Sequence, residues 1–220
     1  MLGMNQIRQL LAAIRTPAIL LIALMGLAAC SQPDTSDAPS TPLSPQATAQ
    51  VLTARGEYQQ AAQLWQQALE EDPGNGSAHY QLGLIQSLIN PEEAEDHLQQ
   101  AIALDPGLEP SARKVLNALR QAKVVDDRAY QLTITGQAFA SLEEWDLAQA
   151  ALETAVELDP EYAEAWAYLG EIRQQTGSGN SLDALEEAIS LDPDSYAANL
   201  FFSIYWLIFY PGLGIPHSSD

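Results

Sequence analysis

Basic residues and cysteine are the scarce components of this 220-residue chain. Nine lysines and arginines stand against 29 acidic residues, which gives a formal net charge of −20. Such a charge repels phosphate backbones and anionic lipid headgroups, so nucleic-acid binding is not expected. The single cysteine, Cys30, excludes an internal disulfide and a multi-cysteine metal site. Apolar residues are not scarce: a hydrophobic content of 47% is enough for a folded core and excludes a disordered chain.

The single cysteine, Cys30, directly follows an apolar N-terminal segment. Arg8 and Arg15 precede the apolar run at 18–29, which has the order of an export signal and is short for a membrane span. The sequence LAAC, ending at Cys30, resembles the lipobox of bacterial lipoproteins. That resemblance implies that Cys30 carries a lipid and becomes the mature N-terminus. We therefore expect residues 1–29 to be a signal peptide and the protein to lie lipid-anchored at a bacterial envelope, on the periplasmic or cell-surface side. An uncleaved signal anchor is the alternative.

Residues 30–46 are rich in proline, serine and threonine, a composition that disfavours both helix and strand. The segment is predicted to be a tether between the membrane and the folded part. A glycosylated or partner-binding stalk has the same composition and stays open as an alternative.

One phrase recurs four times in the remaining chain. EEDP, ALDP, ELDP and SLDP end at Pro73, Pro106, Pro160 and Pro193, with spacings of 33, 54 and 33 residues. A period near 34 residues, built of two helices, indicates a stacked repeat array. Small and large apolar residues recur at fixed distances before the prolines, namely Ala61, Trp65 and Ala68; Ala94, Leu98 and Ala101; Ala148, Leu152 and Ala155; Leu185 and Ala188.

The first half of each unit carries a second signature. Trp166-x2-Leu169-Gly170 has close counterparts in His79-x2-Leu82-Gly83 and Leu132-x2-Thr135-Gly136. These motifs resemble the tetratricopeptide repeat (TPR) family over roughly residues 47–206. The resemblance implies an all-α, TPR-type solenoid of helical hairpins wound into a right-handed superhelix, with units 1 and 2 at 47–108 and units 3 and 4 at 128–194.

The small residues of the motifs have a mechanical role. Glycine in the first helix and alanine in the second let the two helices approach to roughly 8 to 10 Å. Ser181 stands where the other units have alanine, which predicts slightly looser packing in the fourth unit.

The 54-residue spacing holds about 20 residues more than one repeat. Apolar residues at helical intervals predict an additional helix at about 110–123, within an inserted basic segment at 109–127. Five basic residues lie in or just after it, and they either form a cationic contact surface or balance the charge of neighbouring glutamates, the second being favoured because charge runs usually lie on solvated faces: Arg113, Lys114, Arg120, Lys123 and Arg128.

Catalytic, cofactor and metal sites are not expected, so the chain is predicted not to be an enzyme. His79 replaces the usual tryptophan and is interpreted as a packed core residue. His97 follows Glu93 by four residues, a spacing able to hold a metal, but two ligands make a weak site. His217, Ser218 and Asp220 have the residue types of a hydrolase triad, yet a terminal tail, here 211–220, cannot hold them in place.

A binding groove is the stronger prediction. The first helices of stacked hairpins line a concave surface that takes a peptide or a partner helix. Its lack of lysine departs from repeats that clamp a C-terminal carboxylate, so basic or amide-rich extended segments are the expected ligands. The groove positions implied by the resemblance are Tyr80, Gln81, Leu84, Ser87, Tyr130, Thr133, Gln137, Ser141, Ala167, Tyr168, Glu171 and Gln174.

A partial fifth repeat is predicted at 195–210, as a helix that is apolar all round and therefore needs burial. It is too short to span a bilayer. A truncated reading frame, a homodimer or partner interface, or insertion into the membrane surface would each account for it. The candidate interface residues are Phe201, Phe202, Tyr205, Trp206 and Phe209.

Together these features predict a lipid-anchored, extracytoplasmic TPR scaffold that mediates protein–protein contacts at a bacterial envelope. A pilotin-like or assembly-factor role for an envelope machine is one alternative. The other is a repeat appendage that partners an envelope enzyme such as a glycosyltransferase or peptidase.

Overall fold

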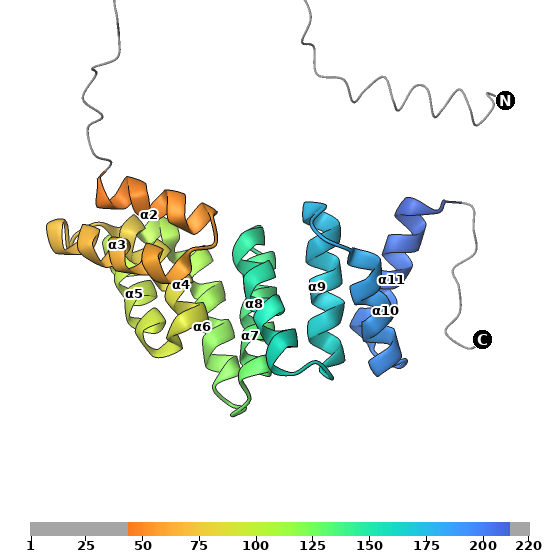
Figure 1. The fold of residues 1–220 in the computed structure, drawn as a ribbon. Coiled ribbons are helices and arrows are strands. Elements are labelled where there is room, and N and C mark those ends of the chain that lie inside the picture. Colours follow the sequence, from red (N-terminus) through yellow and green to blue (C-terminus); the bar gives the residue numbers. More distant parts are fainter. Residues whose placement is uncertain (1–43, 212–220) are drawn as a thin grey trace, which may run out of the picture. The chain divides into compact units, whose positions relative to one another are not determined.

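The computed structural model describes residues 44–211, and within this range the regular structure is helical (Figure 1). The signal peptide, Cys30 and the tail residues His217, Ser218 and Asp220 lie outside the described residues. The α-helices are α2 (Pro45–Ala54), α3 (Tyr58–Glu71), α4 (Gly76–Ile89), α5 (Pro91–Leu104), α6 (Glu109–Ala122), α7 (Arg128–Ala140), α8 (Trp145–Leu158), α9 (Ala163–Thr176), α10 (Ser181–Leu191) and α11 (Tyr196–Phe209), with a short 3₁₀ turn η1 (Pro106–Leu108) before α6.

Four antiparallel hairpins form the array: α2 with α3, α4 with α5, α7 with α8, and α9 with α10 (Figure 1). Helix α6 stands between the second and third hairpins, and α11 follows the fourth. Each helix packs mainly on its neighbours along the chain, as in a solenoid. The prediction of an all-α TPR solenoid with an additional helix is therefore confirmed, and α6 lies within one residue of its predicted limits.

Capping residues fix where the helices begin. Side-chain oxygens of Ser44, Asn75, Asp127 and Ser195 each accept a hydrogen bond from a backbone N–H three residues later. At the start of α2, Pro45 takes the first helical position, where its missing N–H costs nothing. The tether predicted to extend to residue 46 therefore gives way to helix at residue 45.

The aspartate of the repeated phrase stabilises the turn that follows it. Asp72, Asp105, Asp159 and Asp192 precede the four prolines, and each carboxylate accepts a hydrogen bond from the backbone N–H two residues later, at 3.2, 2.9, 3.0 and 3.1 Å. Such a turn offers the backbone an alternative to helix, while the proline ring prevents continuation. Each phrase is thus a joint between successive helical layers.

Close contact between a glycine and a leucine joins the two helices of a hairpin. A methyl group at Gly83 or Gly136 would lie 2.8 or 2.9 Å from the Cγ atom of Leu98 or Leu152. At Gly170 the corresponding distance to Leu185 is 2.6 Å, the shortest of the three. The expectation that Ser181 loosens the fourth unit is therefore wrong, because Ser181 begins its helix and leaves the Gly170–Leu185 contact undisturbed.

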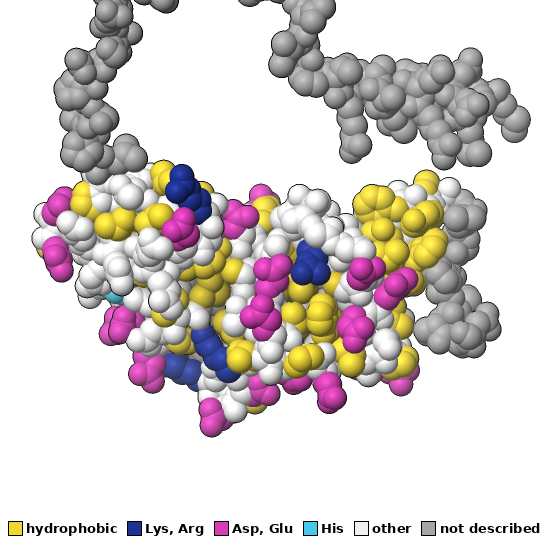
Figure 2. Space-filling view, viewed as in Figure 1, with side chains coloured by type: hydrophobic (Ala, Val, Ile, Leu, Met, Phe, Trp, Pro, Cys, Tyr) yellow, Lys and Arg dark blue, Asp and Glu magenta, His cyan; other side chains and the backbone are white. Residues whose placement is uncertain are grey.

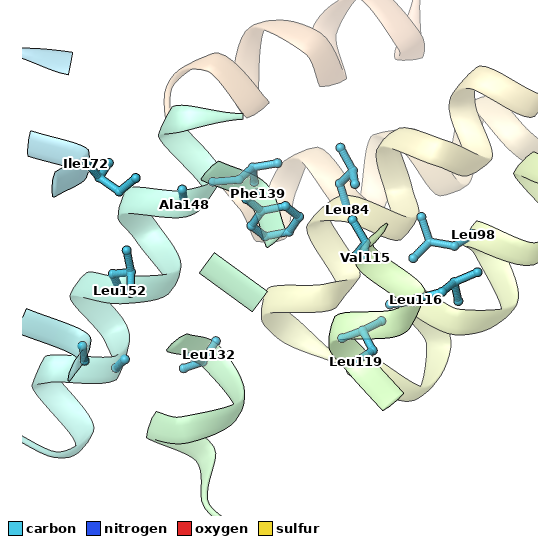
Figure 3. Packing of buried hydrophobic residues seen from close by; sticks show 14 of the residues in the cluster. Leu84, Leu98, Val115, Leu116, Leu119, Leu132, Phe139, Ala148, Leu152 and Ile172 are labelled. Atoms are coloured by element: carbon cyan, nitrogen blue, oxygen red, sulfur yellow. The ribbon is translucent and has the colours of Figure 1, made fainter. Parts of the chain in front are cut away.

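A continuous hydrophobic core runs from α4 to α9 and is filled mainly by leucine and alanine (Figure 3). Leu98, Val115, Phe139 and Leu152 are fully buried within it, so α6 belongs to this core through Val115. Smaller clusters serve the first hairpin, around Trp65, and the contact of α9 with α10 and α11.

Helix α6 begins three residues after Pro106, and α4, α9 and α11 begin three residues after Pro73, Pro160 and Pro193. It therefore stands where the first helix of a repeat would begin. The next helix, α7, is also the first helix of a hairpin. Its Gly136 contacts Leu152 of α8, as Gly83 of α4 contacts Leu98 of α5. Two first-type helices in succession explain the 54-residue spacing.

Candidate partner-binding clefts

The start of α3 contacts the start of α8, although four α-helices, α4 to α7, lie between them in the sequence. Tyr58 donates a hydrogen bond from its hydroxyl to the backbone carbonyl of Asp146, at 3.1 Å. Its ring packs against both the first-hairpin core and the main core. Burial and the nearby carboxylates of Asp146 and Glu153 raise the pKa of Tyr58 to about 12, because each disfavours the phenolate.

A cleft of about 570 Å³ lies beside this contact. We call it the α2–α8 cleft, because α2 and the start of α8 supply much of its wall and α4 and α9 contribute the rest. Its described lining contains three carboxylates, several amide and hydroxyl groups and one indole, and no lysine or arginine: Gln50, Thr53, Ala54, Ser77, Gln81, Glu143, Glu144, Trp145, Asp146, Leu147 and Thr176.

Glu143 is held in an unusual backbone conformation. Its φ of 61° lies in the left-handed region, the only such value for a non-glycine residue in the described range. The equivalent place in the first hairpin is taken by Gly56, with φ 73°. The two turns share their hydrogen bonds, since Glu57 N–H donates to Leu52 and Glu144 N–H donates to Phe139, five residues back. A glutamate thus occupies a position suited to glycine, and strain of this kind often accompanies function.

One carboxylate of the α2–α8 cleft, that of Glu144, lies in surroundings that disfavour its charge. Burial and the neighbouring charge of Asp146 raise the pKa of Glu144 above its usual value. A cation placed in the cleft would relieve this repulsion, whereas an anion would increase it. The cleft therefore offers carboxylate oxygens together with the amide groups of Gln50 and Gln81.

A second cleft, of about 600 Å³, separates the start of α9 from the start of α11. We call it the α9–α11 cleft. It combines four acidic residues with three tyrosines, among them Tyr162, whose hydroxyl donates to Glu164 at 3.2 Å. Burial and the charge of Glu164 raise the pKa of Tyr162 and Tyr168, so both phenols stay neutral at ordinary pH. Tyr168 also packs edge-on against Phe201 of α11, with ring centroids 5.3 Å apart.

The structure separates the predicted groove residues into three groups. Leu84, Ser87, Thr133 and Ala167 are fully buried and Tyr80 is 8% exposed, so the expectation that these five side chains line an open groove is wrong. Ser87 and Thr133 use their hydroxyls within their own helices, as donors to the carbonyls of Gly83 and Ala129. Gln81 lines the α2–α8 cleft and Tyr168 the α9–α11 cleft. Tyr130, Gln137, Glu171 and Gln174 are half-buried and Ser141 is exposed, and their binding role stays a prediction.

Sequence reasoning missed Glu143, Glu144 and Asp146, which come from the turn into α8 and not from a first helix. A signal was present: Glu143-Glu144-Trp145 occupies the place of Gly56-Glu57-Tyr58 in the first unit. The replacement of glycine by Glu143 was the feature of the sequence that indicated this turn.

The predicted basic patch is mostly engaged within the protein. Arg113 pairs with Glu109 and Lys123 with Glu95, both at 2.6 Å. Lys114 donates to the carbonyl of Ser141 at 3.0 Å, and Arg128 to the carbonyl of Leu88 at 2.5 Å. Burial lowers the pKa of Arg128. Pairing with glutamates is thus confirmed for two residues, and two others bind the C-terminal ends of α7 and α4, where a cation is favourable. Arg120 is exposed.

Hydrophobic side chains gather over α11, at one end of the array (Figure 2). The helix is uncharged and mainly apolar, with Asn199 and Ser203 as its polar residues, and Ala198 is its only buried residue. Of the five predicted interface residues, Phe201, Phe202, Tyr205 and Trp206 are half-buried and only Phe209 is exposed. The interface role of the five residues stays a prediction, and the large hydrophobic side chains of this region most open to solvent are Tyr196, Leu200, Ile204, Leu207, Ile208, Phe209 and Tyr210.

Within residues 44–211, no helix has the length and apolar character required to cross a bilayer. The same range contains no group of three or more histidine, cysteine, aspartate or glutamate side chains arranged to hold a metal ion.

Two segments of the chain match a known repeat family. Residues 49–88 and 136–177 match the sequence profile of the TPR repeat. No curated protein matches the chain. Among solved structures, MamA shares 22% identity over 72% of this chain and 82% of its own, with a TM-score of 0.35. YrrB, described as a TPR protein with an unusual peptide-binding site, shares 20% identity over 71% of this chain and 89% of its own, with a TM-score of 0.35. A thermophilic TPR protein of Thermus thermophilus, TTC0263, shares 21% over 74% of this chain and 97% of its own, with a TM-score of 0.34.

Proposed function

We propose that this protein, built of TPR repeats that form a scaffold for protein–protein contacts, is a lipid-anchored envelope scaffold that binds a basic, extended segment of a partner protein in the α2–α8 cleft. The observation that carries the proposal is the composition of that cleft. Three carboxylates, Glu143, Glu144 and Asp146, meet amide side chains in a recess whose described lining has no positive charge.

Charge and shape support a cationic peptide as the ligand. A net charge of −20 attracts a basic partner over long range and accelerates its approach. A lysine or arginine side chain would bring its charge to the carboxylates, and an extended backbone would present donors and acceptors to Gln50 and Gln81. A C-terminal carboxylate would be repelled, which agrees with the absence of lysine from the predicted groove.

The envelope location rests on the leader. Basic residues, an apolar run and the sole cysteine, Cys30, occur in the order of a lipoprotein signal, and the proline-rich segment after it would hold the repeats away from the membrane. A scaffold in this position would hold its partner at the membrane surface. The role of assembly factor for an envelope machine and that of companion to an envelope enzyme are both forms of the same activity, and they differ in the identity of the partner.

The exposed face of α11 supports a second contact surface. Leu207, Ile208 and Phe209 are 70%, 57% and 53% exposed, so the last helix leaves apolar area in contact with water. A second copy of the chain is the proposed occupant, because the helix itself carries no charge and two acidic chains repel least where neither bears one. Sedimentation of the chain and its Leu207→Ser variant tests this contact: a dimer in the first and a monomer in the second is expected, and a monomer in both contradicts it.

Binding is tested with crosslinking on native membranes, followed by titration of the captured partner's basic segment. Substitution of Glu143 and Asp146 by glutamine should weaken binding at least about tenfold and reduce its salt dependence, because two charge pairs are lost. The Glu161→Gln and Asp194→Gln pair, in the α9–α11 cleft, is the matched control with the same change in net charge. Equal weakening by both pairs would show that only net charge matters and would reject the α2–α8 cleft as the site.

Growth with radiolabelled palmitate tests the anchor separately. Label on the protein and its loss in Cys30→Ala are expected, and an unlabelled protein would remove lipidation from the proposal.

A further inference from the structure

The second hairpin brings together two histidines that neither the fold nor the proposed function requires to meet. His79 lies on α4 and His97 on α5, and their Nδ1 atoms are 3.0 Å apart. The ring centroids are 5.3 Å apart with the planes tilted by 37°. Both side chains are half-buried, so the pair is reachable from solvent. The sequence placed Glu93 near His97 at helical spacing, whereas the closest approach in the structure is to His79.

The repeat itself fixes the tautomer of His79. Its Nε2 atom lies 3.3 Å from the carbonyl oxygen of Pro73. At the equivalent position Trp166 donates from Nε1 to Pro160, and Asn199 donates from Nδ2 to Pro193, both at 2.8 Å. The residue at this place therefore serves as a donor to the carbonyl of the closing proline. In a neutral imidazole, a proton on Nε2 leaves Nδ1 without one, so His79 Nδ1 is an acceptor with a free lone pair.

His97 then supplies the proton between the rings, from its own Nδ1. Burial lowers the pKa of His97 and the adjacent His79 lowers it further, although Glu93 and Asp96 oppose both effects. A neutral imidazole nitrogen is the form that binds a metal ion.

We propose that the facing Nδ1 atoms of His79 and His97 form a two-imidazole site for a divalent transition-metal ion, copper or nickel in preference to zinc, which links α4 to α5. Bonds of about 2.0 Å at a right angle place two nitrogens about 2.8 Å apart, and a tetrahedral angle places them about 3.3 Å apart. The observed 3.0 Å lies between these two values and admits either angle, so the preference for copper(II) and nickel(II) rests on the order of affinities of divalent metals for nitrogen ligands.

Binding needs one rearrangement of protons. The proton on His97 Nδ1 moves to Nε2 of the same ring, so two lone pairs face the ion and no proton is lost from the neutral pair. Water fills the remaining coordination positions, and the carboxylates of Glu93 and Asp96 add favourable charge. The ion would brace the second hairpin, and this site is independent of the partner proposed above.

Isothermal titration of the full-length chain, solubilised without a histidine tag, with copper, nickel and zinc chlorides tests the site. One copper or nickel ion per chain is expected, with zinc bound more weakly. His79→Trp reproduces the residue that the repeat uses at Trp166 and so preserves packing, and His97→Asn removes the other ligand. Each should weaken binding at least about tenfold. His217→Asn, in the third histidine of the chain, is the matched control and should bind as the unaltered chain does.

Nitrogen-15 spectra of the imidazoles provide the second measurement: paramagnetic copper(II) should broaden the resonances of both rings selectively, and diamagnetic zinc, at higher concentration, should shift their Nδ1 resonances while Nε2 stays protonated. Absence of one-to-one binding in the unaltered chain would overturn the proposal. So would unchanged affinity in both His79→Trp and His97→Asn, or a loss of binding in His217→Asn.

Discussion

The hydroxyl of Tyr58 donates to the backbone carbonyl of Asp146, 88 residues later in the chain, at 3.1 Å. In a simple solenoid each hairpin contacts only its neighbours. Here the first hairpin reaches the third, and the α2–α8 cleft lies beside the point of contact. Helix α6 lies between the second and third hairpins and contributes buried side chains to the core against which Tyr58 packs.

Tyr58→Phe should lower the free energy of unfolding by about 1 kcal/mol, because the ring stays packed while one hydrogen bond is lost. Urea denaturation measures the change. Tyr162→Phe, in which the lost partner is the nearby side chain of Glu164, is the control and should cost less. A larger loss of unfolding free energy for Tyr162→Phe would mean that the hydrogen bond to Asp146 contributes no more to stability than a local one.

The titration of Tyr58 predicts a fall in stability at alkaline pH. Its pKa of about 12 in the folded protein exceeds the ordinary value of 10, so the folded state holds the proton more tightly than the unfolded chain does. The stabilisation is complete below pH 10 and is lost as the pH rises toward 12. Ultraviolet absorbance of phenolate should show late ionisation that becomes normal on denaturation, and Tyr58→Phe should remove this component.

Glu143→Gly should raise the stability of the protein although it removes a side chain. Relief of the left-handed conformation gains about 1 kcal/mol, and the greater freedom of glycine in the unfolded chain offsets part of that gain. Thermal unfolding should therefore occur at a slightly higher temperature, while affinity for the basic segment falls. Glu161→Gly, an exposed acid at an ordinary φ, should not stabilise. A protein that gains stability and keeps its affinity would exclude Glu143 from binding.

Gly170→Ala should destabilise the fourth hairpin by about 1 to 3 kcal/mol, because the new methyl group would lie 2.6 Å from Leu185 Cγ and 3.2 Å from the carbonyl oxygen of Ser181. Gly74→Ala places a methyl group 3.5 Å from its nearest contact and should change the stability little. Chemical denaturation of the two variants makes the comparison. Similar losses in both would mean that the loss of glycine, and not the helix contact, is responsible.

Lys123→Met should cost about 0.5 to 1 kcal/mol, because it leaves Glu95, a partly buried carboxylate, without its partner across α5 and α6. Arg120→Met removes an exposed charge from the same helix and should have a smaller effect. High salt should reduce the difference between the two variants, since screening weakens the ion pair. A difference that persists in high salt would point to packing as its origin.

Spacing predicted the parts of this fold that depend on local contacts. The spacing of prolines, glycines and alanines predicted the hairpins, the turns between them and α6. A period of about 34 residues indicates one antiparallel helix pair per repeat. The groove was predicted less well. Leu84 and Ala167 belong to the faces that pack between helices, and a rotation of one residue along a helix, about 100°, decides which side chains reach the surface.

Contacts between distant segments were not predictable from repeat position. The approach of Tyr58 to Asp146 joins residues 88 positions apart, and it depends on how all the intervening helices pack, which no residue in the sequence encodes by itself. His79 and His97 meet because α4 and α5 pack closely at Gly83, whereas the sequence suggested only the neighbour of His97 along its own helix. Glu143 was detectable, since it replaces the glycine found at position 56.

The contact of the first hairpin with α8 also affects how the array should unfold. Ordinary repeat stacks unzip from their ends, because each unit is held on one side only. The terminal hairpin of this protein is held on two sides, by the neighbouring α4 and by the carbonyl of Asp146. Opening the N-terminal hairpin therefore breaks a contact with α8 in addition to those with α4, so amide protons of α3 should exchange with solvent more slowly in the unaltered chain than in Tyr58→Phe.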